Sequence, residues 1–167
     1  MAFAAGQKLT AALLNAEFNK DRIAYTSGDQ SRVSSTVLTN AIGLVLPVEA
    51  NAWYIYDGLL MYDTNTTADF KWDMTLPTSS FVRNSPWMTS ASVAGAVDAP
   101  IYHAAYDAGS SDAAGVAAGT IMTIRPTGLI IVSTTSGNMQ MRFAQNVSNA
   151  TATVLKGGSW MRLVKIA

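Results

Sequence analysis

Two stretches, Asp69–Met74 (DFKWDM) and Asn138–Phe143 (NMQMRF), decide the fold class of this 167-residue chain. In each stretch large apolar residues alternate with charged or polar ones. Successive side chains of a β-strand point to opposite faces of a sheet, so a period of two is typical of half-buried antiparallel strands. The two stretches therefore predict strands with one face in a core and the other toward solvent.

Further segments on both sides of these stretches are short and β-like, and turn signals rich in Gly, Pro, Asn, Asp and Ser separate them. They are Ile42–Val48, Trp53–Tyr62, Thr120–Arg125, Gly128–Ser133, Thr151–Leu155 and Trp160–Ile166. This punctuation predicts a mainly β fold, an antiparallel β-sandwich of the jelly-roll kind. Residues 86–118 are rich in Ala, Gly and Ser, and we expect a long excursion there that covers one edge.

A different pattern precedes the predicted sandwich. Leu14 and Phe18 follow at helical spacing after Thr10, a residue suited to cap a helix, and predict a short amphipathic helix over residues 10–20. Three turns of helix are marginal alone in water, so the helix must pack against another surface. The expected docking residues are Phe3, Leu9, Leu13, Leu14 and Phe18. The expected parts are residues 1–25, a docking segment, residues 26–40, a linker that becomes a strand near Val37, and residues 41–167, the sandwich head.

The composition points to an assembled surface. Charged residues make up 13% of the chain, against about 25% in an average domain. Because Trp53–Tyr62 is also apolar on both faces, we expect part of the surface to be buried in an oligomer, with a Ser/Thr/Asn-rich exterior as the alternative. The net charge is zero and no apolar run nears the ~20 residues of a membrane helix, so we expect neither a nucleic-acid partner nor membrane insertion.

The charges are sorted along the chain. Residues 49–112 carry eight acids and two bases, whereas residues 113–167 carry five bases and no acid. Strands from the two halves are able to pair with complementary sign, within a subunit or between subunits. The alternative is that most of these charges form an ordinary solvated face.

No residue constellation indicates catalysis. His103 is the only histidine, and the sequence places no nucleophile or orienting acid beside it. Asp57, Asp63, Asp69 and Asp73 lie close together in the chain, as in some calcium sites and carboxylate pairs, but they lack EF-hand spacing. The chain has no cysteine for a thiolate metal site. We expect no enzyme, no metal site and no cofactor, and leave a structural calcium open.

Aromatic residues on the predicted strands are expected in the core or at a subunit interface, with a sugar-stacking surface as the alternative. The residues expected in the core or interface are Trp53, Tyr54, Tyr56, Phe70, Trp72, Trp160 and Leu163. Trp87, Tyr102 and Tyr106 fall in the less regular stretch and are expected to be exposed. They are the candidates for ligand contact.

The two ends carry a resemblance to a known group of proteins. The opening F-x-x-G-x-x-L-T-A-A-x-L-N over residues 3–15 and the closing V-L-x-G-G-S-W-M-R-L-V-K-I over residues 154–166 resemble the ends of small fibre, spike or decoration proteins of tailed bacteriophages, especially those of actinobacterial hosts. Between them, Asn51-x-x-Tyr54 and Thr67–Trp72 are similar to trimeric jelly-roll heads of the tumour-necrosis-factor or complement-C1q shape.

The resemblance implies a homotrimeric structural protein of the virion, assembled in the bacterial host cytoplasm, with its N-terminus on other virion proteins and its head outward. The site on the particle, whether capsid, neck, tail or baseplate, stays open. The absence of a collagen-like or coiled-coil shaft favours a short spike or a capsid decoration over a long fibre. The alternative is a receptor- or carbohydrate-binding module that grips glycans of the host surface for attachment.

Overall fold

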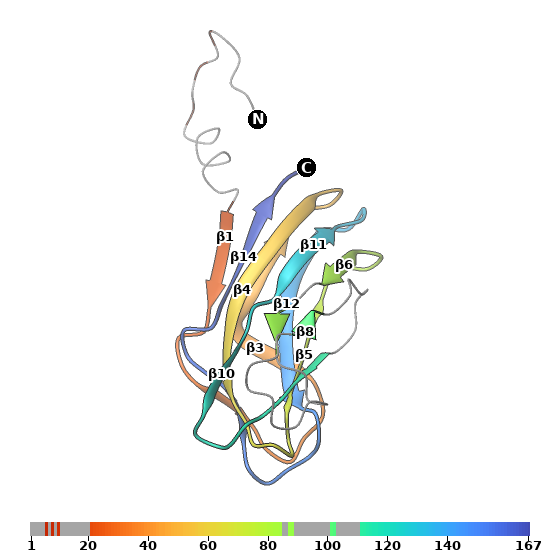
Figure 1. The fold of residues 1–167 in the computed structure, drawn as a ribbon. Coiled ribbons are helices and arrows are strands. Elements are labelled where there is room, and N and C mark those ends of the chain that lie inside the picture. Colours follow the sequence, from red (N-terminus) through yellow and green to blue (C-terminus); the bar gives the residue numbers. More distant parts are fainter. Residues whose placement is uncertain are drawn as a thin grey trace.

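A computed structural model describes residues 21–84, 87–88, 101–102 and 111–167, together with Gly6, Lys8 and Thr10. Within these residues the regular elements are all β-strands, and they form a sandwich of antiparallel sheets (Figure 1). The expected mainly β fold is therefore confirmed. The helix expected over residues 10–20 lies outside the described residues.

The strands follow one another along the chain with short connections in most places. They are β1 Asp21–Tyr25, β2 Gln30–Arg32, β3 Thr39–Val48, β4 Trp53–Asp63, β5 Phe70–Thr75, β6 Phe81–Asn84, β7 Trp87–Met88, β8 Ile101–Tyr102, β9 Ser111–Ala113, β10 Ile121–Ile124, β11 Thr127–Ile131, β12 Gly137–Gln145, β13 Thr153–Leu155 and β14 Trp160–Lys165. Each strand predicted from the sequence overlaps one of them, and the two stretches with the clearest alternation form β5 and β12.

The larger sheet is built on β4, which has different partners along its length. Its first part pairs with β14 on one side and β11 on the other, giving the order β1-β14-β4-β11-β6. Its last part pairs with β10, and with β13, which in turn pairs with β2. Since β1 and β14 are antiparallel and Asp21 lies opposite Val164, the first strand begins at the end of the sandwich where the last strand finishes.

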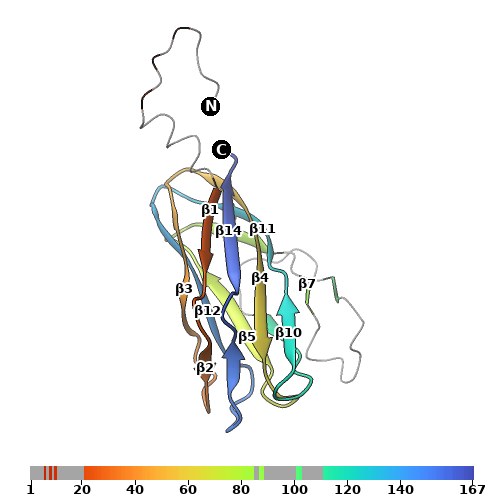
Figure 2. The same cartoon turned by 90° about the vertical axis from the view of Figure 1, so that its left-hand side faces the viewer.

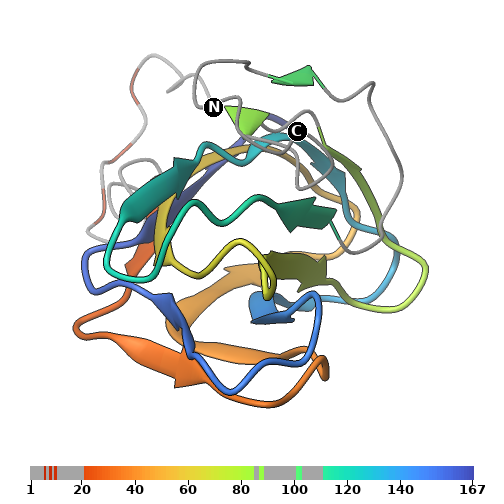
Figure 3. The ribbon, with the colours of Figure 1, turned by 60° about the horizontal axis from the view of Figure 1, so that its bottom comes forward.

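The smaller sheet has the order β3-β12-β5-β9, and β7 pairs with β8 in a separate ribbon. The side view shows β3, β12 and β5 stacked against the larger sheet (Figure 2). Seen from the lower end, the strands curve around a central core (Figure 3). Successive strands alternate between the sheets, since β3 and β5 lie in the smaller sheet and β4 and β6 in the larger one.

The core fills the space between the sheets with aromatic side chains. Phe70 of β5 stacks on Tyr62 of β4 at 4.6 Å and on Phe143 of β12 at 5.7 Å between ring centroids. The hydroxyl of buried Tyr62 donates to the carbonyl of Ala114 at 2.7 Å, so its polar end is satisfied. The Phe70–Tyr62 contact joins the two sheets, because β5 belongs to the smaller one and β4 to the larger one.

The sheets begin earlier in the chain than the alternation predicted, because β1 and β2 precede the strand expected near Val37. β1 packs closely against β3 at Gly43, where a Cβ atom would lie 2.4 Å from the carbonyl oxygen of Tyr25 and where φ is +87°. Only glycine fits this crossing without a shift of backbone. β2 is tied to β3 through Gln30, whose amide oxygen accepts the Ile42 N–H at 2.7 Å and whose amide nitrogen donates to the Ile42 carbonyl at 2.8 Å.

Candidate interaction surface

The outer face of the larger sheet is mostly apolar. Along β4, Tyr54 and Tyr56 point into the core and are fully buried, whereas Trp53 and Ile55 point outward and are 46% and 47% exposed. Alternate residues of paired strands share a face, so apolar side chains of the neighbouring strands lie beside them. We call this surface the apolar face, and its members are Ile23, Tyr25, Trp53, Ile55, Leu59, Met61, Phe81, Leu129, Ile131, Trp160 and Val164. Arg83 of β6, opposite Leu129, points to the same side.

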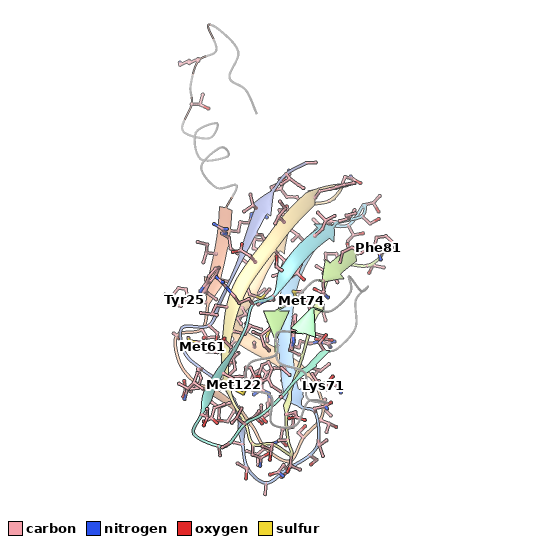
Figure 4. The ribbon with its side chains drawn as sticks, viewed as in Figure 1. Tyr25, Met61, Lys71, Met74, Phe81 and Met122 are labelled. Atoms are coloured by element: carbon pink, nitrogen blue, oxygen red, sulfur yellow. The ribbon has the colours of Figure 1, made fainter. Side chains whose placement is uncertain are left out.

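The apolar face consists of two groups of side chains, one on each side of a sheet row that contains Arg162, Asp57 and Thr127. The cross-strand pairs within these groups are Tyr25–Trp160, Trp160–Leu59, Val164–Ile55, Ile55–Leu129, Trp53–Ile131 and Ile131–Phe81. Tyr25 lies at one margin and Phe81 at the other (Figure 4), and their exposed fractions are 64% and 58%. With full areas of about 150–250 Å² per aromatic side chain, Tyr25, Trp53 and Phe81 alone leave on the order of 300 Å² in water. These three side chains alone reach the lower end of the roughly 300–600 Å² of the largest apolar patch on a typical monomer.

One ion pair lies in the middle of the apolar face. Arg162 of β14 is directly opposite Asp57 of β4, and its Nε donates to Asp57 Oδ1 at 2.9 Å. Ile55 and Leu59 are the next outward residues of β4 on either side of Asp57. The pair therefore has apolar neighbours along β4, whereas Thr127 of β11 lies opposite Asp57, and Arg162 and Asp57 still have 40% and 34% of their side-chain surface exposed.

The upper end of the larger sheet is held by a charged cluster. The Glu49 carboxylate pairs with Arg22 of β1 and, at 2.7 Å, with Lys165 of β14. The hydrogen bond from Lys165, together with the one from Arg22, lowers the pKa of Glu49. Arg22 also donates to the carbonyl of Pro47. The cluster thus ties the first strand to the last strand and to the turn between β3 and β4.

The outer face of the smaller sheet is mostly polar, although Val45 and Pro47 of β3 are exposed on it. Arg142 of β12 lies opposite Asp73 of β5, and its Nε donates to Asp73 Oδ1 at 2.9 Å. This hydrogen bond raises the pKa of Arg142. The Gln140 amide donates to the Ala41 carbonyl at 3.0 Å, and Lys71 lies opposite Asp112. We call this surface the polar face, and its members are Asn40, Val45, Pro47, Lys71, Asp73, Thr75, Asp112, Asn138, Gln140 and Arg142.

The expected pairing between the acidic and basic halves of the chain occurs within one subunit. The pairs that join the halves are Arg142–Asp73, Arg162–Asp57 and Lys165–Glu49. Two of them lie directly across neighbouring strands, where opposite charges favour the register.

The residues predicted for the core or interface divide between the two sides of the sheets. Tyr54, Tyr56, Phe70, Trp72 and Leu163 are buried between the sheets. Trp53 and Trp160 lie on the apolar face. Among the ligand-contact candidates, Trp87 and Tyr102 are brought opposite each other by the pairing of β7 and β8. Tyr106, His103 and the docking residues Phe3, Leu9, Leu13, Leu14 and Phe18 lie outside the described residues.

The four aspartates considered for metal or acid–base chemistry are engaged separately. Asp57 and Asp73 pair with arginines on opposite faces. Asp63 Oδ1 accepts the Gly119 N–H and Asp69 Oδ1 accepts the Gly115 N–H, each at 2.9 Å. Burial, opposed by the bond from Gly115 and reinforced by nearby Asp112, raises the pKa of Asp69. Within the described ranges, no three acidic or histidine side chains gather into a metal-binding group.

Three members of the apolar face lie on strands that the sequence did not predict. Ile23 and Tyr25 alternate around buried Ala24, and Phe81 precedes buried Val82. The same period of two that revealed β5 is present there, but β1 and β6 are only five and four residues long. In the described part of the chain, no helix has the length and apolar character needed to cross a membrane.

A scan against family models gives no match, and a search of curated proteins gives none either. Among solved structures, the chain is similar to one from infectious bursal disease virus, Gt strain, at 12% identity and a TM-score of 0.43, covering 86% of this chain and 33% of that one. For the Gx strain the identity is 10% and the TM-score 0.37, and the match covers 86% of this chain and 32% of that one. For the VP2 subviral particle of the same virus the identity is 10% and the TM-score 0.23, and the match covers 87% of this chain and 42% of that one.

The chain thus spans about a third of the length of the first two solved chains. All three TM-scores are below 0.5, so these likenesses carry no argument about fold or function. The β-sandwich is established by the strand pairing itself.

Proposed function

We propose that this chain is a non-enzymatic structural protein of a bacteriophage virion, a homotrimeric surface spike or capsid decoration. Copies of its jelly-roll head associate through their apolar faces, and residues before β1 attach the trimer to another virion protein. The apolar face is the observation that carries this proposal.

The occupant that best fits the apolar face is a second copy of the same chain. Another copy brings an equally apolar surface, so one contact removes two exposed patches from water. The net charge of zero gives no long-range repulsion between copies. The Arg162–Asp57 pair neutralises its own two charges within each copy, so this pair adds no net charge to the contact.

The placement of the chain ends supports attachment through the N-terminal segment. β1 begins where β14 finishes, and the Glu49 cluster holds that end of β1 in the sheet. The segment that resembles phage N-termini therefore leaves the sandwich at a fixed point. Its proposed docking residues are Phe3, Leu9, Leu13, Leu14 and Phe18.

Sedimentation equilibrium of the full chain, from nanomolar to tens of micromolar, tests self-association. A homotrimer has three times the 17.7 kDa mass of one chain, and this is the expected result. A single-chain mass over the whole range would overturn the proposal. Removal of residues 1–20, which ends before β1, is expected to keep the trimer and abolish incorporation into particles. Incorporation of the truncated chain at the full-length level would contradict the docking role.

Host-glycan binding is a second candidate, favoured by the pairing that sets Trp87 opposite Tyr102. Aromatic residues on neighbouring strands are able to stack on sugar rings. A glycan array probed with the trimer tests it, and specific binding that a Trp87→Ala, Tyr102→Ala variant loses would support this role. The absence of binding to any glycan on the array would favour a purely structural function.

A further inference from the structure

The larger sheet has a polar centre within the apolar face, which consists of the Arg162–Asp57 pair and a hollow beside it. The hollow has a volume of about 250 Å³ and is lined by Asp57, Gly58, Arg125, Pro126 and Thr127. This is smaller than the roughly 300–1,000 Å³ of sites for drug-sized ligands, and suits a side chain or a few water molecules.

The strand register explains why the hollow is there. β11 pairs with β4 up to Asp57, and β10 pairs with β4 from Leu60 onward. Between these two points the chain turns at Pro126, which has no N–H to donate to β4. Gly58 lies in this gap, and a Cβ atom there would come within 2.6 Å of the Trp160 carbonyl oxygen. The gap is therefore a feature of the sheet and does not depend on flexible side chains.

Several groups around the hollow are polar, and not all of them have a hydrogen-bond or ion-pair partner. Asp57 Oδ1 accepts the bond from Arg162 Nε. Arg125 is exposed, and in the described part of the chain it forms no ion pair and no hydrogen bond through its side chain. A second copy that covered this region would remove the guanidinium of Arg125 and the second oxygen of Asp57 from water. Each would then need a partner in the contact.

The polar face supplies a matched pair for comparison. Arg142 and Asp73 have the same cross-strand placement and the same 2.9 Å Nε–Oδ1 bond as Arg162 and Asp57. Arg142 is flanked on its strand by Gln140, a polar neighbour. Side-chain exposures are 32% and 11% for Arg142 and Asp73, so the pair on the apolar face is the more open one in a single chain.

We propose that the Asp57–Arg162 pair and its hollow set the register in which copies of this chain associate. This inference rests on the proposed self-association. Apolar contact is non-directional, so the surrounding side chains permit many sliding arrangements of similar free energy. A covered charge that finds no partner is strongly unfavourable, and this excludes arrangements that leave Asp57 or Arg125 unmatched. The polar centre therefore selects the geometry of the contact, whereas the aromatic side chains supply its affinity.

The test replaces the whole pair by apolar residues of similar size, in the full-length chain. The Asp57→Leu, Arg162→Met double variant is compared with Asp73→Leu, Arg142→Met by native mass spectrometry and sedimentation velocity. The first variant is expected to associate at least as tightly as the parent but with two or more stoichiometries in comparable amounts. The second, on the polar face, is expected to keep the single stoichiometry of the parent.

Single variants separate register from affinity. Asp57→Leu removes the carboxylate that accepts the hydrogen bond from Arg162 Nε inside the contact, and it is expected to weaken association by at least about 100-fold. Asp73→Leu leaves Arg142 in water and is expected to change association by less than about twofold. Equal effects of the two single variants would overturn the proposal.

A charge exchange covers the case in which the apolar double variant does not fold. Asp57→Arg with Arg162→Asp keeps a cross-strand pair and the total charge but replaces the carboxylate beside Arg125 by a second cation. It is expected to lose the single stoichiometry. If the parent has one stoichiometry and the pair variants that fold retain it, the register role is wrong and self-association stands. If the parent is a single chain at all concentrations, the proposed function itself fails.

Discussion

The two outer faces of the sandwich differ although they are built alike. Each carries one arginine–aspartate pair directly across two neighbouring strands, with Nε–Oδ1 distances of 2.9 Å. Around Arg142 and Asp73 the neighbours are mostly polar, whereas Arg162 and Asp57 have mostly apolar neighbours, with Thr127 as an exception. The side chains of the polar face are suited to contact with water, whereas the apolar face leaves aromatic side chains exposed to it.

This difference teaches that the fold and the assembly use separate surfaces of the same strands. In β4 the inward residues form the core with the smaller sheet, and the outward residues form the apolar face. A substitution at an inward position of these strands should therefore change stability, and a substitution at an outward position of β4 should change association.

The largest expected effect is on stability, at an inward position. Phe143→Ala removes a buried ring that stacks on Phe70, and it is expected to lower the free energy of unfolding by about 3–5 kcal/mol. Val45→Ala, outward on neighbouring β3, is expected to lower it by less than about 1 kcal/mol. Urea unfolding at one fixed protein concentration measures both. Similar losses of stability in the two variants would contradict the assignment of inward residues to the core and outward residues to the surface.

Next in size is a charge placed on each outer face. Ile55→Glu puts an unpaired carboxylate into the proposed contact and is expected to weaken self-association by at least about 100-fold. Val45→Glu on the polar face is the control and is expected to leave it unchanged. Sedimentation equilibrium compares the two variants. If Val45→Glu dissociates the protein and Ile55→Glu does not, the two faces have been assigned the wrong way round.

A smaller effect is expected from shortening one aromatic residue of the apolar face. Trp53→Ala removes a large exposed side chain next to Ile131 and is expected to weaken association about 30-fold, as for a typical hot spot. Thr75→Ala on the polar face is expected to have no effect. Dilution followed by light scattering gives both dissociation constants, and an unchanged value for Trp53→Ala would remove Trp53 from the contact.

The smallest expected effect lies in the turn between β4 and β5, which belongs to neither face. Burial raises the pKa of Asp69 in the folded protein, so its ionised form costs stability once the pH exceeds the unfolded pKa. Asp69→Asn keeps an oxygen for the Gly115 N–H and suits the positive φ of 51°. The variant is expected to melt slightly higher at neutral pH, with no gain below the unfolded pKa, and to associate normally. A gain that is the same at every pH would exclude ionisation as the cause.

Much of the fold could be predicted because alternation is a local property. Lys71 and Asp73 alternate with Phe70, Trp72 and Met74, and that pattern alone fixes a strand with a buried side. β1 carries the same alternation over only five residues, which is too short to identify a strand, and its contact with β3 depends on the close approach at Gly43.

The candidate surface was only partly predictable because it is a product of register. Trp53–Tyr62 is apolar on both faces, which indicated that its outer face is covered as well. The separation of acidic and basic residues along the chain indicated ion pairs between the two halves. Nothing local shows that Arg162 lies opposite Asp57, or that β10 and β11 leave a gap beside it. Those facts arise from strands that are far apart in the chain.

The central claim is that copies of this chain cover the apolar face, and thiol labelling tests it most directly. The chain has no cysteine, so Ile55→Cys and Val45→Cys each introduce a single reactive group. In one chain the two positions are exposed to similar extents, 47% and 40%. If the apolar face is covered, Ile55→Cys reacts at least about tenfold more slowly than Val45→Cys at assembly concentrations, and dilution removes the difference. Equal rates at every concentration would contradict the claim.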